Sequence, residues 1–225
     1  MKRSVGTGKI CVLTSRSSWL FPFSREFVGR LRDGGREATL FDHHKDVRDA
    51  HDVVFYLSYF QIVPPEFLSR HGMNLVVHES DLPRGKGWSP LFWQVLEGLS
   101  SVPVVLFEAM PHVDSGKIYL REMIELQGHE LHDEIRAIQA NKTFELCDRY
   151  LAEADRIVPL EQQGIETFYD RRSPSHSELD IDRSLREQFN LLRVCSNDHF
   201  PAYFEHLGHR FVIRITKAES TPDSN

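Results

Sequence analysis

The stretch His78-Glu79-Ser80-Asp81-Leu82-Pro83-Arg84-Gly85-Lys86-Gly87 follows directly on the apolar run Leu75-Val76-Val77. This order predicts a strand that ends in a histidine and opens into a loop rich in Pro and Gly. The next segment begins with Ser89 and Pro90 and ends at Gly98, which is typical of a helix. Open α/β sheets place their functional groups at the carboxyl ends of their strands, so His78 is a candidate functional residue.

Outward from this loop, apolar runs and helical patterns alternate along the chain. Strands are expected at 10–14, 37–41, 53–57, 74–77, 102–107 and 118–121, and helices at 24–32, 64–72, 89–98, 131–153, 159–168 and 184–193. Short runs at 203–205 and 211–215 flank Gly208 and predict a β-hairpin. The alternation favours an α/β fold: a Rossmann-like, doubly wound, mostly parallel sheet with a small C-terminal helix and β-hairpin extension.

The composition changes after residue 168, where a polar, proline-containing connector begins. We therefore expect a main domain over 1–168, an extension made of linker, helix and β-hairpin over 169–217, and a disordered polar tail over 218–225.

Charge and cysteine usage limit the function classes. The 225-residue chain carries a formal net charge of −6, which argues against a general nucleic-acid or anionic-membrane binder. Its three cysteines are far apart and form no CxxC pair, so we expect the reducing cytoplasm. No signal peptide or membrane span is visible, and a soluble protein is expected. The two histidines in His129-Glu130-Leu131-His132 have the wrong spacing for a zinc-binding helix pair, and no metal is expected.

The histidine loop resembles that of the folate-dependent formyltransferases, a family that includes the catalytic domain of methionyl-tRNA formyltransferase. The family loop reads roughly His-Pro-Ser-Leu-Leu-Pro, followed by a basic residue, a glycine and a helix opened by proline. The matching positions here are His78, Ser80, Leu82, Pro83, Gly87 and Pro90, and Asp114 with Gly116 matches the Asp-x-Gly loop of the family.

The resemblance implies an N-formyltransferase with 10-formyltetrahydrofolate as co-substrate. His78 would move the proton or polarise the formyl carbonyl, and Asp114 would orient the imidazole and stabilise its charged form. The folate-binding residues implied by the resemblance are Ser80, Leu82, Pro83, Gly87, Phe107 and Met110. Each of these, taken singly, also fits ordinary structural packing.

One position departs from the family pattern. The family has an asparagine two residues before the histidine, and this chain has Val76 there. Asn74 lies on the same strand face but roughly 7 Å further along, so it is no simple substitute. A non-catalytic folate- or nucleotide-binding relative is therefore the alternative function.

The acceptor is suggested by the connector. Arg171 and Arg172 resemble the Arg-Arg-x-Pro connector of nucleotide-sugar N-formyltransferases, and paired guanidinium groups suit a diphosphate, although a solvated connector is equally compatible. Tyr59 and Trp88 are candidates for stacking on a base or sugar. We expect a nucleoside-diphosphate amino sugar as substrate. The apolar hairpin near the C-terminus is also a candidate surface for pairing two copies of the chain. A methionyl-tRNA formyltransferase-like enzyme is less expected, because the chain is acidic and has few residues after the connector. Another alternative is a related hydrolase, which would give the formyl group to water.

Overall fold

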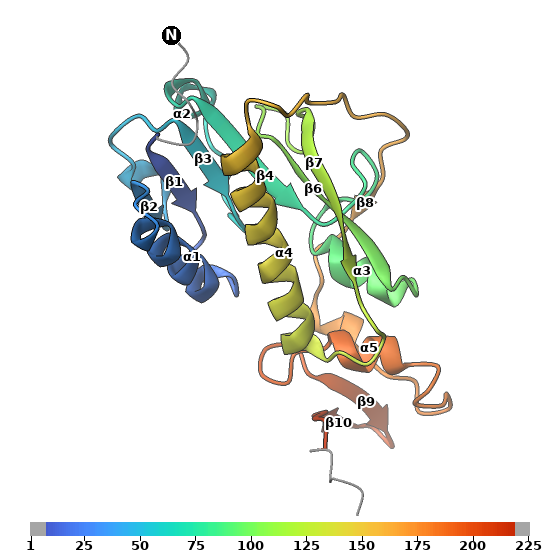
Figure 1. Ribbon diagram of the computed structural model, residues 1–225. Coiled ribbons are helices and arrows are strands. Elements are labelled where there is room, and N and C mark those ends of the chain that lie inside the picture. The colour runs from blue at the N-terminus through green and yellow to red at the C-terminus, as the bar shows by residue number, and fades with distance from the viewer. Residues whose placement is uncertain (1–7, 219–225) are drawn as a thin grey trace, which may run out of the picture.

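The computed structural model describes residues 8–218 and contains one six-stranded sheet in the order β2-β1-β3-β4-β6-β7 (Figure 1). Its strands are β1 (Ile10–Leu13), β2 (Ala38–Phe41), β3 (Val53–Tyr56), β4 (Met73–His78), β6 (Ser101–Glu108) and β7 (Ile118–Glu125). Strands β1 to β4 are parallel, whereas β6 pairs antiparallel with both β4 and β7. The predicted α/β fold with a mostly parallel sheet is confirmed.

Helices cover both faces of this sheet. They are α1 (Phe21–Asp33), α2 (Pro65–Arg70), α3 (Pro90–Leu96), α4 (His132–Glu153) and α5 (Phe189–Val194), with 3₁₀ turns at His44–Asp46 and Pro174–Ser177. In Figure 1, α1 and α4 lie side by side on one face, where the rings of Phe27 and Phe144 stack 4.6 Å apart. Phe67 and Leu68 of α2 belong to a separate cluster with residues of β1 and β3. The sheet is therefore doubly wound.

The local sequence explains the central strands and the first helix. All residues of β1 and β3 are buried, as expected for parallel strands covered on both faces. Helix α1 begins at Phe21, earlier than predicted, because Pro22 suits its first turn. Ser24, where the sequence predicted the helix to begin, lies inside the helix and accepts a hydrogen bond from Thr14 Oγ1 at 2.9 Å.

The helix predicted over 159–168 is wrong. Leu160 instead pairs antiparallel with Ile118 through two main-chain hydrogen bonds of 2.8 Å, and Gly164 has φ +121°. The segment ends in β8 (Phe168–Tyr169), which pairs in parallel with β5 (Lys86–Gly87) in the histidine loop. We call residues 160–169 the strap, since it runs extended from the edge strand β7 to this loop.

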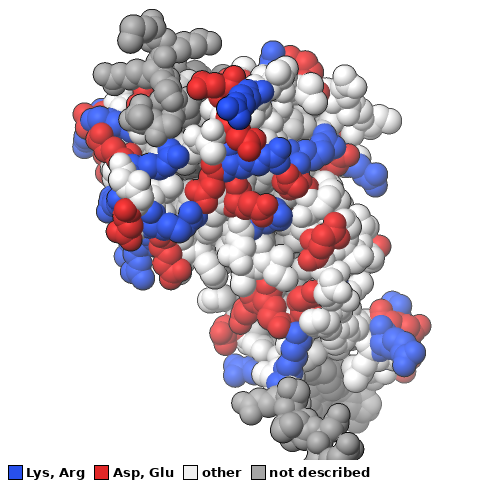
Figure 2. Space-filling model, in the orientation of Figure 1, with Lys and Arg blue, Asp and Glu red and all other residues white. Residues whose placement is uncertain are grey.

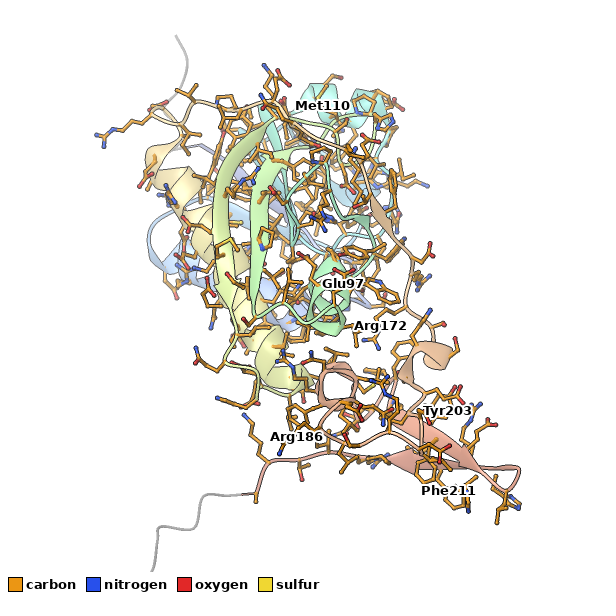
Figure 3. All side chains as sticks on the ribbon, turned by 90° about the vertical axis from the view of Figure 1, so that its right-hand side faces the viewer. Glu97, Met110, Arg172, Arg186, Tyr203 and Phe211 are labelled. Atoms are coloured by element: carbon orange, nitrogen blue, oxygen red, sulfur yellow. The ribbon has the colours of Figure 1, made fainter. Side chains whose placement is uncertain are left out.

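The C-terminal extension has a small core of its own, formed by Leu179, Leu192, Cys195 and Ala202. Helix α5 is shorter than the predicted 184–193, because the Glu187 carboxylate bonds the Ser184 amide and hydroxyl in a separate turn. The predicted hairpin is present as β9 (Ala202–His206) and β10 (His209–Ile213), with Tyr203 and Phe211 on it (Figure 3). Pairing of two copies through it stays a prediction. The predicted tail, apart from residue 218, lies outside the described residues.

Acidic and basic side chains are interspersed on the face seen in Figure 2. Arg149 of α4 contacts both Glu122 and Glu153. Within residues 8–218, no helix combines the length and the hydrophobicity needed to cross a bilayer.

Candidate active site

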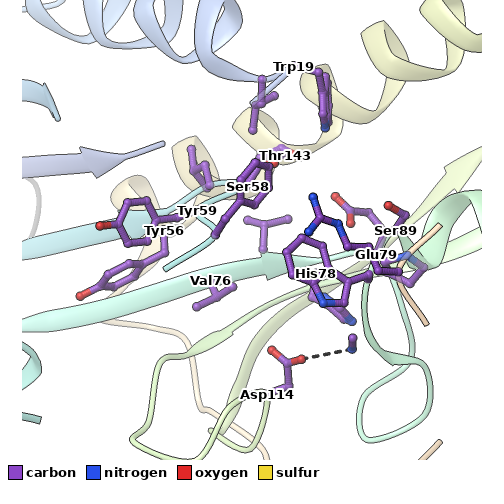
Figure 4. A pocket seen from close by; sticks show the side chains of 18 of the residues that line it. Trp19, Tyr56, Ser58, Tyr59, Val76, His78, Glu79, Ser89, Asp114 and Thr143 are labelled. Atoms are coloured by element: carbon purple, nitrogen blue, oxygen red, sulfur yellow. Dashed lines mark hydrogen bonds between the residues drawn. The ribbon is translucent and has the colours of Figure 1, made fainter. Parts of the chain in front are cut away.

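A cavity of about 650 Å³ lies at the carboxyl ends of β3 and β4. Its walls come from these strand ends, from α3 and α4, and from the start of the C-terminal extension. His78 and Asp114 both line it, as Figure 4 shows. The cavity thus lies where open α/β sheets bind their ligands.

His78 is the last residue of β4 and is 8% exposed. Its Nε2 lies 2.8 Å from the carbonyl oxygen of Gly85. A carbonyl can only accept, so Nε2 carries the proton and Nδ1 of the neutral ring is an acceptor. Nδ1 has no hydrogen-bond partner among the described residues. The loop therefore fixes one tautomer and leaves a basic nitrogen on a residue that lines the cavity.

Asp114 has a left-handed backbone, with φ +54°, and its Oδ2 lies 3.5 Å from the Gly87 amide, the dashed contact in Figure 4. No hydrogen bond or ion pair joins Asp114 to His78 in the described structure. Gly116 explains the Asp-x-Gly spacing, because a Cβ there would lie 1.9 Å from the carbonyl oxygen of Glu108. Only glycine lets this loop approach β6 so closely.

Val76 and Asn74 differ in what surrounds them. Val76 lines the cavity on the same strand face as His78, at the position of the family asparagine. The Asn74 amide is buried elsewhere: Oδ1 accepts from Tyr56 Oη and Nδ2 donates to the carbonyl oxygen of Leu68. Both of its polar atoms are occupied, so Asn74 provides no amide to this site.

The residues implied for folate fall into two groups. Gly87, Phe107 and Met110 line the cavity. Ser80, Leu82 and Pro83 do not line it: Leu82 is 1% exposed and packs in one cluster with Phe107. Ser80 is also buried, and its hydroxyl oxygen has no hydrogen-bond partner within residues 8–218. Leu82 therefore packs behind the cavity wall, and Ser80 and Pro83 are buried in the same loop.

All four residues expected to bind the acceptor line the cavity. Tyr59 is held by His44, whose Nδ1 is 2.7 Å from its hydroxyl oxygen. The Arg171 guanidinium lies over the Trp88 ring, 4.9 Å from its centroid.

Arg172 differs from Arg171 in its surroundings. It lies at the junction with the C-terminal extension (Figure 3) and donates to the carbonyl oxygens of Val194 and His176. Burial lowers the pKa of Arg172. The Arg172 guanidinium therefore joins separate parts of the extension to one another.

Arg136 was missed by the sequence analysis, which used only the apolar positions of helix 131–153. It lines the cavity with its guanidinium 4.3 Å from the Trp19 centroid and 4.2 Å from the Phe92 centroid. Its Nη1 donates to Gln139 Oε1, and Gln139 Nε2 donates to Glu79 Oε1. Burial lowers the pKa of Arg136 to about 9, although the nearby Glu79 opposes this. Only the fold brings this cation to the cavity, and no sequence motif marks it.

The described residues contain no group of three or more His, Cys, Asp or Glu side chains arranged to hold a metal ion.

Comparison with known proteins gives the following relatives. No protein-family model matches the chain. A methionyl-tRNA formyltransferase of Rickettsia massiliae is 33% identical over 120 residues, which are 52% of this chain and 39% of that protein. The match thus spans about two fifths of the length of that curated relative.

Solved structures extend the likeness to nearly the whole chain. A methionyl-tRNA formyltransferase from Clostridium thermocellum has a TM-score of 0.74 at 18% identity and covers 95% of both chains. A sugar N-formyltransferase from a Shewanella species has a TM-score of 0.67 at 16% identity, over 95% of this chain and 99% of that one. HypX from Aquifex aeolicus, in complex with tetrahydrofolic acid, has a TM-score of 0.66 at 15% identity, over 90% of this chain and 36% of that one. At these identities the structures establish the fold.

Proposed function

Because this chain is related in sequence and fold to the folate-dependent formyltransferases, we propose that it moves a formyl group from 10-formyltetrahydrofolate to the amine of a nucleotide-linked amino sugar. The observation that carries the proposal is the hydrogen bonding of the His78 ring. Its Nε2 is tied to Gly85, and its Nδ1 remains available as a base on a residue that lines the cavity.

The chemistry needs one proton carrier. The acceptor nitrogen attacks the formyl carbon, and His78 Nδ1 takes the proton that the amine loses. The bond between N10 of the folate and the formyl carbon then breaks as the imidazolium gives this proton to N10. The products are the formamide and tetrahydrofolate. Asp114 lines the same cavity, and its proposed role is to stabilise the positive charge that forms on His78 during the transfer.

Val76 removes the side-chain amide that would donate a hydrogen bond to the formyl oxygen in relatives with an asparagine at this position. A valine cannot donate a hydrogen bond to the formyl oxygen, and the Asn74 amide is already bonded. The negative charge that develops on this oxygen must therefore be met by another donor. The protonated Nδ1 of His78 is such a donor within the cavity. We expect slower catalysis than in relatives that have the asparagine.

Charge and aromatic side chains support an anionic acceptor. Arg171 over Trp88, together with Arg136 between two rings, gives the cavity two cations beside flat apolar surfaces. A nucleoside diphosphate offers both phosphate oxygens and a ring that can stack. Arg172, whose guanidinium already bonds two carbonyls, adds positive charge more than direct contact.

For folate, we propose that Phe107, Met110 and Gly87 contact the ligand, while Ser80, Leu82 and Pro83 shape the wall behind them. The solved relative with tetrahydrofolic acid supports a folate ligand. The formyl form is part of the proposal.

Methionyl-tRNA is the second candidate acceptor, because the curated relatives are methionyl-tRNA formyltransferases. Tetrahydrofolate release from 10-formyltetrahydrofolate distinguishes the possibilities when it is measured with nucleoside-diphosphate amino sugars, with initiator methionyl-tRNA and with water alone. We expect release that depends on one sugar nucleotide. Release with the tRNA would establish the second acceptor, and release in water alone would indicate a hydrolase. Folate binding without any release would indicate a non-catalytic relative.

His78→Gln tests the mechanism. We expect kcat to fall at least about 100-fold, the usual effect of losing an acid–base group, with folate affinity retained. His209→Gln, on the exposed strand β10, is the matched control and should leave turnover unchanged. Near-normal turnover of the His78 variant would refute this role.

A further inference from the structure

The strap contacts the loops that carry both proposed catalytic residues, although it lies far from them in sequence. At one end, Gln162 Nε2 donates to the carbonyl oxygens of Asp114 and Gly116, at 3.0 and 2.8 Å. At the other end, Thr167 contacts the loop that holds the His78 ring. A single extended segment thus connects the two sides of the site.

Two consecutive peptide groups of the histidine loop form hydrogen bonds with Thr167. The carbonyl of Gly85 accepts from His78 Nε2, and the N–H of the same peptide, which belongs to Lys86, donates to the carbonyl oxygen of Thr167 at 2.9 Å. The Gly85 amide also donates to Thr167 Oγ1 at 2.8 Å. Hydrogen bonds in such a chain polarise one another, so the strap strengthens the acceptor that fixes the His78 tautomer.

Further contacts hold this end of the strap against the loop. Lys86, which is 2% exposed, pairs through Nζ with Glu166. A Cβ on Gly87 would lie 2.4 Å from the carbonyl oxygen of Tyr169, and Trp88 N donates to that same oxygen. The close approach of two main chains leaves little freedom for either. These contacts restrain the shape of the loop.

We propose that the strap is the positioning element of the active site: the Thr167 hydroxyl, beside its main-chain carbonyl, holds Gly85, whose carbonyl fixes the His78 tautomer, and Gln162 holds the backbone of the Asp114 loop. Neither residue lines the cavity, so both act through the groups they orient. The proposal depends on the proposed function only where it assigns His78 and Asp114 to catalysis. Its geometric part can be tested without turnover.

The variants are Thr167→Val, which keeps the side-chain shape but removes the hydroxyl, and Gln162→Leu. Two matched controls are available. Thr167→Ser retains a hydroxyl, and Gln163→Leu changes the adjacent, exposed glutamine, which has no hydrogen bond in the described structure. We expect Thr167→Val and Gln162→Leu each to lower kcat about tenfold with KM for folate unchanged, since misplacing a reacting group slows the chemical step. The controls should stay within twofold of the wild type.

The second readout is the ring ¹⁵N chemical shifts of His78, assigned by comparison with His78→Gln. We expect the Nε2–H tautomer in the wild-type protein and in Thr167→Ser, and a mixture of tautomers in Thr167→Val. This measurement needs no acceptor, so it decides the proposal even if the protein proves inactive. Thr167→Val keeps the main-chain bond to Lys86, so identical His78 shifts in this variant and the wild type would overturn the role of the Thr167 hydroxyl. Equal kcat for Gln162→Leu and Gln163→Leu in an active enzyme would overturn the role of Gln162.

Discussion

The buried ion pair between Arg193 and Glu130 fastens the C-terminal extension to the sheet domain. Arg193 Nη1 lies 3.4 Å from Glu130 Oε2, and the two side chains are 2% and 7% exposed. Arg193 Nε also donates to Asn190 Oδ1 at 2.8 Å. Replacing Arg193 with Met keeps much of the apolar volume but leaves the Glu130 carboxylate buried without its cation.

The size of the effect follows from what remains around Glu130. Removing one partner of a buried ion pair costs about 3–5 kcal/mol. The amides of Gln127 and Gly128 still donate to this carboxylate, at 2.6 and 2.9 Å, so we expect the lower end, about 3 kcal/mol. For a domain of this size that lowers Tm by about 6–12 °C.

Urea unfolding followed by circular dichroism measures this change. Arg210→Met is the matched control, because the Arg210–Glu205 pair is 55% and 54% exposed, and its midpoint should not move. We also expect Arg193→Met to raise KM for the acceptor, since Arg171 and Arg172 lie at the start of the extension that this pair fastens. A loss below about 1 kcal/mol would refute the view that this pair anchors the extension.

Two further predictions concern the titratable side chains of His71 and Arg136. Burial, helped by the positive charge of Arg70, lowers the pKa of His71 to about 4. As the pH falls, His71 is therefore protonated in the unfolded chain before it is protonated in the folded one, and the free energy of unfolding should fall by up to about 3 kcal/mol between about pH 6.5 and 4. His71→Phe should flatten this part of the curve of unfolding free energy against pH. An unchanged slope would exclude His71 as the cause of the pH dependence. Arg136→Met should raise KM for the acceptor about tenfold with little change in kcat, as expected for losing a hydrogen bond to a charged group. Arg149→Met, on the same helix but outside the cavity lining, is its control, and equal KM values for the two variants would remove Arg136 from the binding site.

The histidine loop was predictable because its signals are local. A continuous apolar run gives a parallel strand buried on both faces, and Pro90 suits the first turn of the helix that follows the loop. The resemblance implied that Asp114 acts together with His78; both residues line one cavity, and their roles stay a prediction.

The surroundings of these residues were less predictable. Nothing local indicates that His78 bonds to Gly85, because that contact depends on the conformation of the whole loop. The direct approach of Asp114 to His78, which its proposed orienting role would suggest, is absent from the described structure, where the Gly87 amide is the nearest partner of the carboxylate.

The sequence by itself determined the order of strands and helices up to residue 153, the position of the histidine at a strand end and the hairpin, because each depends on residues that are neighbours in the chain. The tertiary structure alone decided the course of the strap and the arrival of Arg136 at the cavity. Residues 159–168 can form helical turns, but their main-chain groups find partners at Ile118 and Lys86, far away in the sequence. Pairing with distant strands outweighs a weak local preference, and such partners become visible only when the chain is folded.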